Sequence, residues 1–319
     1  MYAILYNLFF ELKRKERQIH SEKFSRFCRK YYDLFDIYLN VIFRKFITVF
    51  GRRKSGVTKK KRKQKVIVSL TSFPMRIETV YVTIETIFRQ SVKADEVILW
   101  LAESQFDGFD SLPESLKKLC KRGLTIRFCD DIKSHKKYYY VFHEYQNDLV
   151  ITFDDDMFYP KDTIKKLLQL HRKYPEDVIS ISSQCIPEDI SKLPSVWNSL
   201  REQVISSKKA QPFTGAGTLF QPYKYNKVLY NKELIRELAP YADDLWIYIV
   251  GYISGINVTT IEKPRCFYPS IWGTDESSLF NLNGVKGKNY NDIQWERLVK
   301  YFMWSDNHGV NHNNADIQC

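Results

Sequence analysis

Three consecutive carboxylates, Asp154, Asp155 and Asp156, are the residues of this sequence whose type and spacing point most directly to chemistry. They follow residues 150–153, a short apolar and β-branched run that predicts a buried strand. Like charges at a strand end repel one another unless water or a cation neutralises them, and carboxylate oxygens suit Mg²⁺ or Mn²⁺ carrying a diphosphate. The plain alternative is a solvated turn in which Asp162 caps the next helix. The buried run before the triplet favours a ligand site, because open α/β sheets bind ligands at the carboxyl ends of their strands.

The triplet lies inside a regular alternation of strand and helix patterns that begins at residue 66. This alternation predicts an α/β fold with a mainly parallel sheet and helices on both of its faces. At 319 residues and 44% hydrophobic content, the chain is long enough for one such domain and an appendage. The expected strands are residues 66–70, 96–101, 124–129, 149–153 and 177–182, and the expected helices are residues 77–90, 112–121, 134–145 and 163–174.

Polar residues follow these expected strands, whose ends meet along one edge of a parallel sheet. Each loop alone is ordinary, but together they supply hydroxyls, an acid for a ribose and cations for phosphates, as a nucleotide pocket requires. The residues concerned are Thr71, Ser72 and Arg76 after the first strand, and Asp131, Lys136 and Lys137 after the third.

Taken in order, these segments resemble the nucleotide-sugar-dependent glycosyltransferases of the GT-A type, whose fold is Rossmann-like, especially bacterial enzymes that build capsular or surface polysaccharides. The resemblance spans about residues 66–301 and is carried by residues 68–77, 88–91, 131–138, 151–156 and 243–246. It implies that Asp154 and Asp156 form the family's DxD motif, in which the carboxylates hold a divalent cation and the sugar nucleotide around it. It also implies that Asp155 lies near the ribose or the donor sugar.

The second half of the sequence predicts the acceptor side of such an enzyme. Gly215 and Gly217 belong to a small-residue loop that resembles the one beside the donor sugar, where the lack of side chains lets the backbone approach substrate. A tight turn into a strand explains them equally well. Asp243 and Asp244 open an expected helix, so they are either capping charges or an acid pair. The resemblance favours the pair, with Asp244 or Asp243 as the general base that deprotonates the acceptor hydroxyl.

The formal charge of +12 comes entirely from the first fifth of the chain. Residues 1–65 hold 19 Lys and Arg against five Asp and Glu, a net charge of +14, so the rest of the chain sums to −2. Residues 1–50 repeat aromatic and aliphatic clusters between these cations without reaching the roughly 18 uncharged apolar residues of a membrane span. They predict an amphipathic helical segment lying on an anionic membrane surface. The alternative is a helical hairpin packed on the protein's own body.

These patterns divide the chain into an N-terminal membrane-surface segment (residues 1–50), a flexible basic linker (51–65), a GT-A catalytic domain (66–305) and a tail (306–319). The domain has a nucleotide-sugar half, residues 66–182, and an acceptor half, residues 183–305. His308 in the tail is a candidate third metal ligand, because some GT-A enzymes supply a C-terminal histidine. Without residues 1–60, the remaining body should stay soluble and bind the donor.

The expected function is metal-dependent transfer of a hexose from a nucleoside diphosphate sugar, UDP-linked, to a hydroxyl of a lipid-linked or polysaccharide glycan acceptor. The expected setting is surface or capsular polysaccharide synthesis at the cytoplasmic face of the cell membrane, with peripheral attachment through residues 1–65. The six cysteines form no CxxC pair, and nothing at the N-terminus resembles a cleavable signal peptide, which fits reduced thiols in the cytoplasm.

Two other functions remain open on the sequence alone. A nucleotidyl- or phosphosugar transferase also needs acids and a cation, but it would place a glycine-rich phosphate loop after the first strand, and residues 71–77 contain no glycine. A non-enzymatic membrane or nucleic-acid adaptor using only residues 1–65 leaves the acidic triplet without a role. No motif of a folded nucleic-acid-binding domain lies beside the basic segment, so we expect no nucleic-acid partner.

Overall fold

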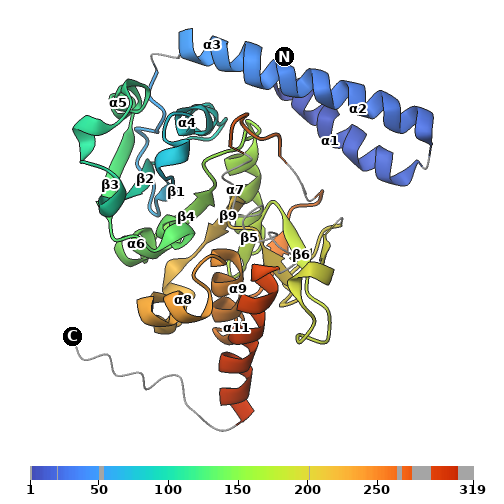
Figure 1. Cartoon of the computed structure of the whole chain (residues 1–319), viewed down its shortest axis with the longest axis vertical. Coiled ribbons are helices and arrows are strands. Elements are labelled where there is room, and N and C mark those ends of the chain that lie inside the picture. Colours follow the sequence, from blue (N-terminus) through green and yellow to red (C-terminus); the bar gives the residue numbers. More distant parts are fainter. Residues whose placement is uncertain are drawn as a thin grey trace.

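The computed structural model describes residues 2–19, 21–49, 54–200, 202–263, 268–274 and 289–307. A seven-stranded sheet in the order β10-β5-β9-β4-β1-β2-β3 runs through its centre (Figure 1). Every neighbouring pair is parallel except the two made by β9, which is antiparallel to β4 and β5. The predicted α/β fold with a mainly parallel sheet is therefore confirmed. The strands are β1 (Val66–Thr71), β2 (Glu96–Ala102), β3 (Leu124–Cys129), β4 (Leu149–Phe153), β5 (Val178–Ser180), β9 (Ala216–Phe220) and β10 (Val258–Thr260).

Helices cover both faces of the sheet, because successive strand residues point to opposite sides. In β4, for example, Val150 belongs to one buried core and Ile151 to the other. One face carries α4 (Val80–Phe88), α5 (Glu114–Cys120) and α7 (Thr163–Lys173). The other carries α6 (Lys136–Glu144), α8 (Lys232–Leu238), α9 (Asp243–Ile253) and α11 (Tyr290–Asn307).

Two predicted helices begin later than their sequence patterns. The helix expected from residue 77 starts at Val80, after a 3₁₀ turn at Pro74–Arg76 whose proline favours an N-terminal turn. The helix expected from residue 134 starts at Lys136, after a 3₁₀ turn at Lys133–His135. A small antiparallel sheet in the order β7-β6-β8 was not predicted, since its strands are only two or three residues long. These are β6 (Ser183–Cys185), β7 (Asn198–Ser199) and β8 (Ala210–Pro212).

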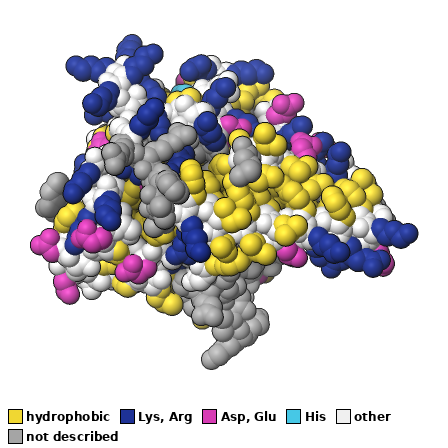
Figure 2. Space-filling view, turned by 90° about the horizontal axis from the view of Figure 1, so that it is seen from above, with side chains coloured by type: hydrophobic (Ala, Val, Ile, Leu, Met, Phe, Trp, Pro, Cys, Tyr) yellow, Lys and Arg dark blue, Asp and Glu magenta, His cyan; other side chains and the backbone are white. Residues whose placement is uncertain are grey.

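The N-terminal segment folds as a helical hairpin that lies along one end of the domain (Figure 1). Ser21 begins the second helix, where its hydroxyl accepts a hydrogen bond from the amide of Phe24 at 3.5 Å. One side of the hairpin forms a buried core with Phe158 and Ile271 of the domain. This side of the segment therefore matches the alternative expectation of a hairpin packed on the protein's own body. Much of the opposite side is apolar and exposed (Figure 2). The elements are α1 (Tyr2–Gln18), α2 (Glu22–Ile37), the π-helix η1 (Tyr38–Phe43) and α3 (Arg44–Val49).

The basic segment after the hairpin is held against the domain over its described part, residues 54–65. The amide of Gly56 donates to the carbonyl of Arg122, and the amide of Thr58 donates to the carbonyl of Ala94, both at 2.8 Å. Arg62 forms an ion pair of 2.6 Å with Asp95. The sequence pattern predicted a flexible linker because it counted cations, whereas these tertiary contacts hold residues 54–65 against the domain.

Among the described residues, no helix combines the length and the apolar character needed to cross a membrane. His308 and the rest of the predicted tail beyond Asn307 lie outside the described residues, as does most of the polar loop that precedes α11. The third metal ligand predicted at His308 stays a prediction.

Candidate active site

The acidic triplet begins directly after β4, at the carboxyl end of a strand that lies parallel beside β1. The amide of Asp154 donates to the carbonyl of Gly215 at 3.1 Å and to the hydroxyl of Tyr159 at 3.0 Å. That hydroxyl in turn donates to the carbonyl of Gly215 at 2.5 Å. Tyr159 is fully buried. The turn that carries the triplet is therefore fixed to the loop before β9.

Asp155 points into the protein and is satisfied by two residues that were predicted to bind the donor. The Ser72 hydroxyl donates to its Oδ2 at 2.5 Å, and Arg76 forms an ion pair with its Oδ1 at 2.7 Å. Burial raises the pKa of Asp155, while Arg76 and Ser72 act in the opposite direction. Ser72 and Arg76 therefore reach the predicted site, where they orient the triplet itself.

Asp156 has one engaged and one free carboxylate oxygen. Its Oδ2 lies 2.9 Å from Arg76, whereas its buried Oδ1 has no hydrogen-bond partner among the residues that the structure describes. Burial, followed by repulsion from Asp155, raises the pKa of Asp156 to about 7. A buried oxygen without a partner costs free energy unless a ligand satisfies it.

Lys137 joins the triplet to the acid pair at the start of α9. Its ammonium lies 2.7 Å from Asp154 and 2.9 Å from Asp243, and the side chain is buried. Burial lowers the pKa of Lys137, but the neighbouring carboxylates outweigh it, so the pKa is raised overall and the charge is kept. The Ser69 hydroxyl donates to the Lys137 carbonyl at 2.6 Å and ties the first turn of α6 to β1. Lys137 was predicted as a phosphate-binding cation, and the structure gives it carboxylate partners.

Asp243 and Asp244 both contact Thr214 in the loop before β9. Thr214 places its hydroxyl 2.7 Å from Asp243 and within hydrogen-bond distance of Asp244, and its amide donates to Asp244 at 2.7 Å. Burial opposes ionisation of both acids. Lys137 and His135 nevertheless lower the pKa of Asp243 to about 2, whereas burial and the neighbouring Asp243 raise the pKa of Asp244 to about 7. The two adjacent acids are therefore electrostatically distinct.

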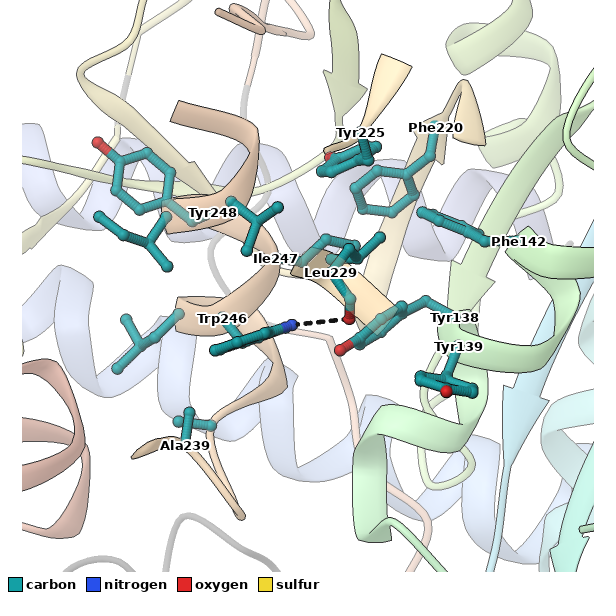
Figure 3. Close-up of a cluster of buried hydrophobic side chains, with 14 of the residues drawn as sticks. Tyr138, Tyr139, Phe142, Phe220, Tyr225, Leu229, Ala239, Trp246, Ile247 and Tyr248 are labelled. Carbon is teal, nitrogen blue, oxygen red and sulfur yellow. Dashed lines mark hydrogen bonds between the residues drawn. The ribbon is translucent and has the colours of Figure 1, made fainter. Parts of the chain in front are cut away.

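The helices that carry these charges are anchored by one aromatic core (Figure 3). Tyr138 and Phe142 of α6 lie in this core with Trp246 of α9. The Trp246 indole donates to the carbonyl of Leu229 at 3.1 Å, as Figure 3 shows. A core of this size positions Lys137 and the acid pair on rigid elements, as a site that acts on a substrate requires.

The two predicted glycines serve the turn into β9. A β-carbon at Gly215 would overlap the carboxylate of Asp154, because this carboxylate occupies the space beside the glycine. Gly217 has φ of 93°, a conformation that favours glycine. These positions fit the alternative of a tight turn into a strand, and their contact with substrate stays a prediction.

The other predicted donor residues have partners of their own. The Thr71 hydroxyl donates to the carbonyl of Trp100 at 2.8 Å. Asp131 forms ion pairs with Lys136 at 2.8 Å and with Lys133 at 2.6 Å, which lower its pKa to about 2 against the effect of burial. Asp131 and Lys136 thus form a second charged cluster after β3, apart from the bridge made by Lys137.

Sequence reasoning missed Thr214, Tyr159 and His135. Thr214 had one available signal, a hydroxyl directly before a small-residue turn. His135 is fully buried between the Tyr138 hydroxyl and the Ala239 carbonyl, each 2.7 Å from a ring nitrogen. Burial lowers its pKa to about 4, so its ring is neutral near pH 7. Nothing local in the sequence marks this contact, because Ala239 lies 104 residues away.

The triplet offers oxygen ligands for a divalent ion without enclosing one. In the described part of the chain, no three His, Cys, Asp or Glu side chains converge as a metal site. Mg²⁺ sites commonly use one or two carboxylates together with substrate phosphates and water. The partly exposed side chain of Asp154 and the free Oδ1 of Asp156 fit that pattern.

One family model matches this chain, and several solved structures are similar to it. A search of curated proteins finds no match to the chain. One similar solved structure is the mannosyltransferase PcManGT from Pyrobaculum calidifontis in complex with GDP-Man and Mn²⁺, at 13% identity over 84% of this chain and 79% of that chain, with a TM-score of 0.41. A second is TarS 1-349 of S. aureus, at 14% identity over 77% of this chain and 74% of that chain, with a TM-score of 0.42. A third is a CMP:2-keto-3-deoxy-manno-octonic acid synthetase complexed with CTP, at 16% identity over 62% of this chain and 90% of that chain, with a TM-score of 0.37. The model of glycosyl transferase family 2 matches residues 75–237, just over half of the chain and the whole acidic triplet. The chain therefore belongs to glycosyl transferase family 2 and is a glycosyltransferase.

Proposed function

We propose that this protein transfers a sugar from a nucleoside diphosphate sugar, UDP-linked, to a hydroxyl of a glycan or lipid-linked oligosaccharide in surface or capsular polysaccharide synthesis. The observation that carries the proposal is the bridge made by Lys137. Its ammonium joins Asp154 of the triplet to Asp243 of the acid pair, so a site for a phosphate-bound cation and a site for proton removal lie side by side.

Asp154 and Asp156 are the residues that would hold Mn²⁺ or Mg²⁺. When bound, the ion supplies positive charge to the diphosphate that leaves the sugar. Arg76 keeps Asp156 in place through Oδ2 and leaves Oδ1 available as a ligand. Asp155 is engaged by Ser72 and Arg76, so we give it the role of orienting the turn beside the donor.

Asp244 is the general base in this proposal. A base works best when its pKa is near the working pH, and the pKa of Asp244 is raised to about 7 while that of Asp243 is lowered to about 2. The Thr214 amide orients the Asp244 carboxylate. Asp244 takes the proton of the acceptor hydroxyl as its oxygen bonds to the anomeric carbon, and the bond from that carbon to the nucleoside diphosphate breaks. Asp243 stays ionised beside Lys137 and keeps the pair in place.

The proposal is tested by incubating the full chain with UDP-sugars and GDP-sugars, a panel of glycan acceptors and Mn²⁺. We expect release of a nucleoside diphosphate that depends on Mn²⁺, is fastest with a UDP-sugar and is lost in Asp156→Ala. Pyrophosphate release from a nucleoside triphosphate and a sugar phosphate would instead identify a nucleotidyltransferase. Failure to hydrolyse or transfer any nucleotide sugar would overturn the proposal.

A further inference from the structure

The N-terminal hairpin has two apolar sides, and the domain covers one of them. Large apolar side chains on the other side are between 38% and 72% exposed. Seen from the end of the molecule that carries the hairpin, hydrophobic side chains form a broad patch with Lys and Arg side chains at its margins (Figure 2). We call this surface the outer face of the hairpin, and it comprises Ile4, Leu8, Phe27, Leu34, Ile37, Val41, Ile42 and Phe46.

The spacing of these residues is that of an amphipathic helix. In the run from α2 to α3, Phe27, Leu34 and Val41 recur at intervals of seven, which places them on one stripe. The buried stripe lies one position later, at Cys28 and Phe35. The domain covers the buried stripe and leaves the other stripe exposed. Large exposed apolar patches of this kind mark interaction surfaces.

Charge decides between the possible partners of the outer face. The exposed charged side chains of the described hairpin are eight cations and two acids, Glu22 and Asp33. A second copy of the chain would bring two positive surfaces together, whereas anionic lipid headgroups complement them. The exposed cations are Arg14, Lys15, Arg17, Lys23, Arg26, Arg29, Lys30 and Lys45.

We propose that the outer face docks on the surface of an anionic lipid bilayer, as at the cytoplasmic face of the cell membrane. The apolar side chains enter the boundary between headgroups and acyl chains, and the long cationic side chains reach the phosphates. The attachment is peripheral, because the apolar side chains reach only the boundary between headgroups and acyl chains. This docking does not depend on the transfer reaction that we propose.

The inner side of the hairpin gives this docking a consequence for the active site. Tyr2 donates to the carbonyl of Tyr159 at 2.8 Å, and Tyr6 donates to the carbonyl of Phe158. Asn40 donates to the carbonyl of Ser270 at 3.1 Å. Phe158 and Tyr159 follow the triplet by two and three residues, so the docked hairpin lies between the membrane and the backbone that carries the triplet. A docked molecule therefore holds its site close to acceptors that are embedded in the same bilayer.

The test is co-sedimentation of the full chain with phosphatidylcholine vesicles and with vesicles that also contain phosphatidylglycerol. We expect binding to the anionic vesicles, weak binding to the neutral ones, partial release by high salt and full release by detergent. The double variant Phe27→Ser, Leu34→Ser should weaken binding about tenfold or more, because it removes two inserting side chains. Arg26→Gln with Lys30→Gln should weaken binding to anionic vesicles and leave binding to neutral ones unchanged.

The matched control is Val196→Ser with Ile205→Ser, since these side chains are 60% and 50% exposed but lie outside the hairpin. This control should bind vesicles as the unmodified chain does. All of the substituted side chains are exposed, so circular dichroism and the melting temperature should show an unchanged fold. Equal binding to neutral and anionic vesicles would overturn the proposal, as would undiminished binding of the Phe27 and Leu34 double variant. Light scattering that shows a dimer lost in that variant would assign the outer face to a second copy.

Discussion

Gly215 and Asp154 approach so closely that a β-carbon at position 215 would lie 1.7 Å from Oδ2 of Asp154. The small residue before β9 is therefore a condition for the position of the first aspartate. The contact is reinforced by the backbone, because the Asp154 amide donates to the Gly215 carbonyl at 3.1 Å. The turn before β9 and the triplet after β4 behave as one unit.

Substitution of Gly215 by alanine should displace the Asp154 carboxylate from Lys137. We expect Gly215→Ala to lower kcat/KM about tenfold or more and to raise the Mn²⁺ concentration needed for half-maximal rate. The control is Gly108→Ala, where φ is 80° but no atom lies near the added β-carbon. It should cost about 1 kcal/mol of stability and leave kcat/KM intact. Unchanged kinetics in Gly215→Ala would contradict the role of this contact.

Lys137→Met should destabilise the protein, because it leaves the buried carboxylate of Asp243 without its cation. Loss of one member of a buried ion pair costs about 3–5 kcal/mol. Asp243 has a lowered pKa, so its stabilising contribution is present above the ordinary aspartate pKa and is lost as the pH falls toward about 2. Urea unfolding at pH 7 measures this loss of stability, and at pH 3 the difference between the variant and the unmodified chain should be smaller. Lys137→Arg keeps the charge and should retain more of the stability, and equal losses in both variants would argue against the ion pair.

The pH dependence of activity should follow Asp244. At saturating Mn²⁺, we expect kcat/KM to fall as the pH drops through about 7, where this carboxylate becomes protonated. Asp244→Asn keeps the shape of the side chain and an oxygen for the Thr214 amide, but it cannot accept a proton. Its kcat should fall by about 10²–10⁴ with donor binding little changed. A larger loss in Asp243→Asn would transfer the role of base to Asp243.

The raised pKa of Asp244 also leads to a prediction for stability. Because the pKa of Asp244 is raised above its value in the unfolded chain, the folded protein binds the extra proton between about pH 4 and pH 7. Ionisation of Asp244 therefore lowers the free energy of unfolding as the pH rises through this window. Asp244→Asn should remove this dependence and exceed the unmodified chain in stability at pH 8 by about 1 kcal/mol or more. Chemical unfolding at pH 5 and pH 8 measures it, and a less stable variant at pH 8 would show that the carboxylate is stabilising.

Asp156→Ala should abolish metal-dependent activity without unfolding the protein. The substitution removes one of several crowded carboxylates and leaves Arg76 paired with Asp155, so we expect a melting temperature within a few degrees of the unmodified chain. Titration of Mn²⁺ in the presence of a nucleoside diphosphate, followed by electron paramagnetic resonance, measures binding independently of turnover. If excess Mn²⁺ restored full turnover in Asp156→Ala, Asp156 would not be a metal ligand.

The sequence predicts the parallel strands and the helices between them well, because each of these elements is specified by a local pattern. The run before Asp154 forms β4, and the acid pair at Asp243 opens α9. The insertion of β9 between β4 and β5 was not predicted, since its antiparallel pairing with β4 joins segments more than 60 residues apart. Such pairing is set by tertiary packing rather than by a local pattern.

The roles of the cations were harder to predict than their positions. Arg76 and Lys137 were expected to meet phosphates, since the loops that carry them follow strands. In the structure, Arg76 pairs with Asp155 and Lys137 with Asp243, 106 residues away. A sequence shows that acids and bases are both present, but the pairing among them depends on the fold. The electrostatic difference between Asp243 and Asp244 has the same origin, because it arises from Lys137.

The hairpin changes what we expect of a truncated chain. The sequence predicts a soluble body without residues 1–60, but the hairpin shares a buried core with Val82, Phe158 and Ile271 of the domain. All three side chains are fully covered, so truncation would expose them to water. We expect the truncated protein to have a lower melting temperature and to aggregate, as measured by thermal unfolding and size-exclusion chromatography.

A single substitution separates this packing from the effect of truncation itself. Tyr6→Phe keeps the ring in the buried core and removes only the hydroxyl that donates to the Phe158 carbonyl, leaving that carbonyl without this donor. The expected cost is about 1–3 kcal/mol of stability, with vesicle binding unchanged because Tyr6 is buried on the inner side. Because Phe158 follows the triplet by two residues, kcat/KM should also fall in this variant. A truncated chain as soluble and stable as the full one, together with a neutral Tyr6→Phe, would show that the domain does not need the hairpin.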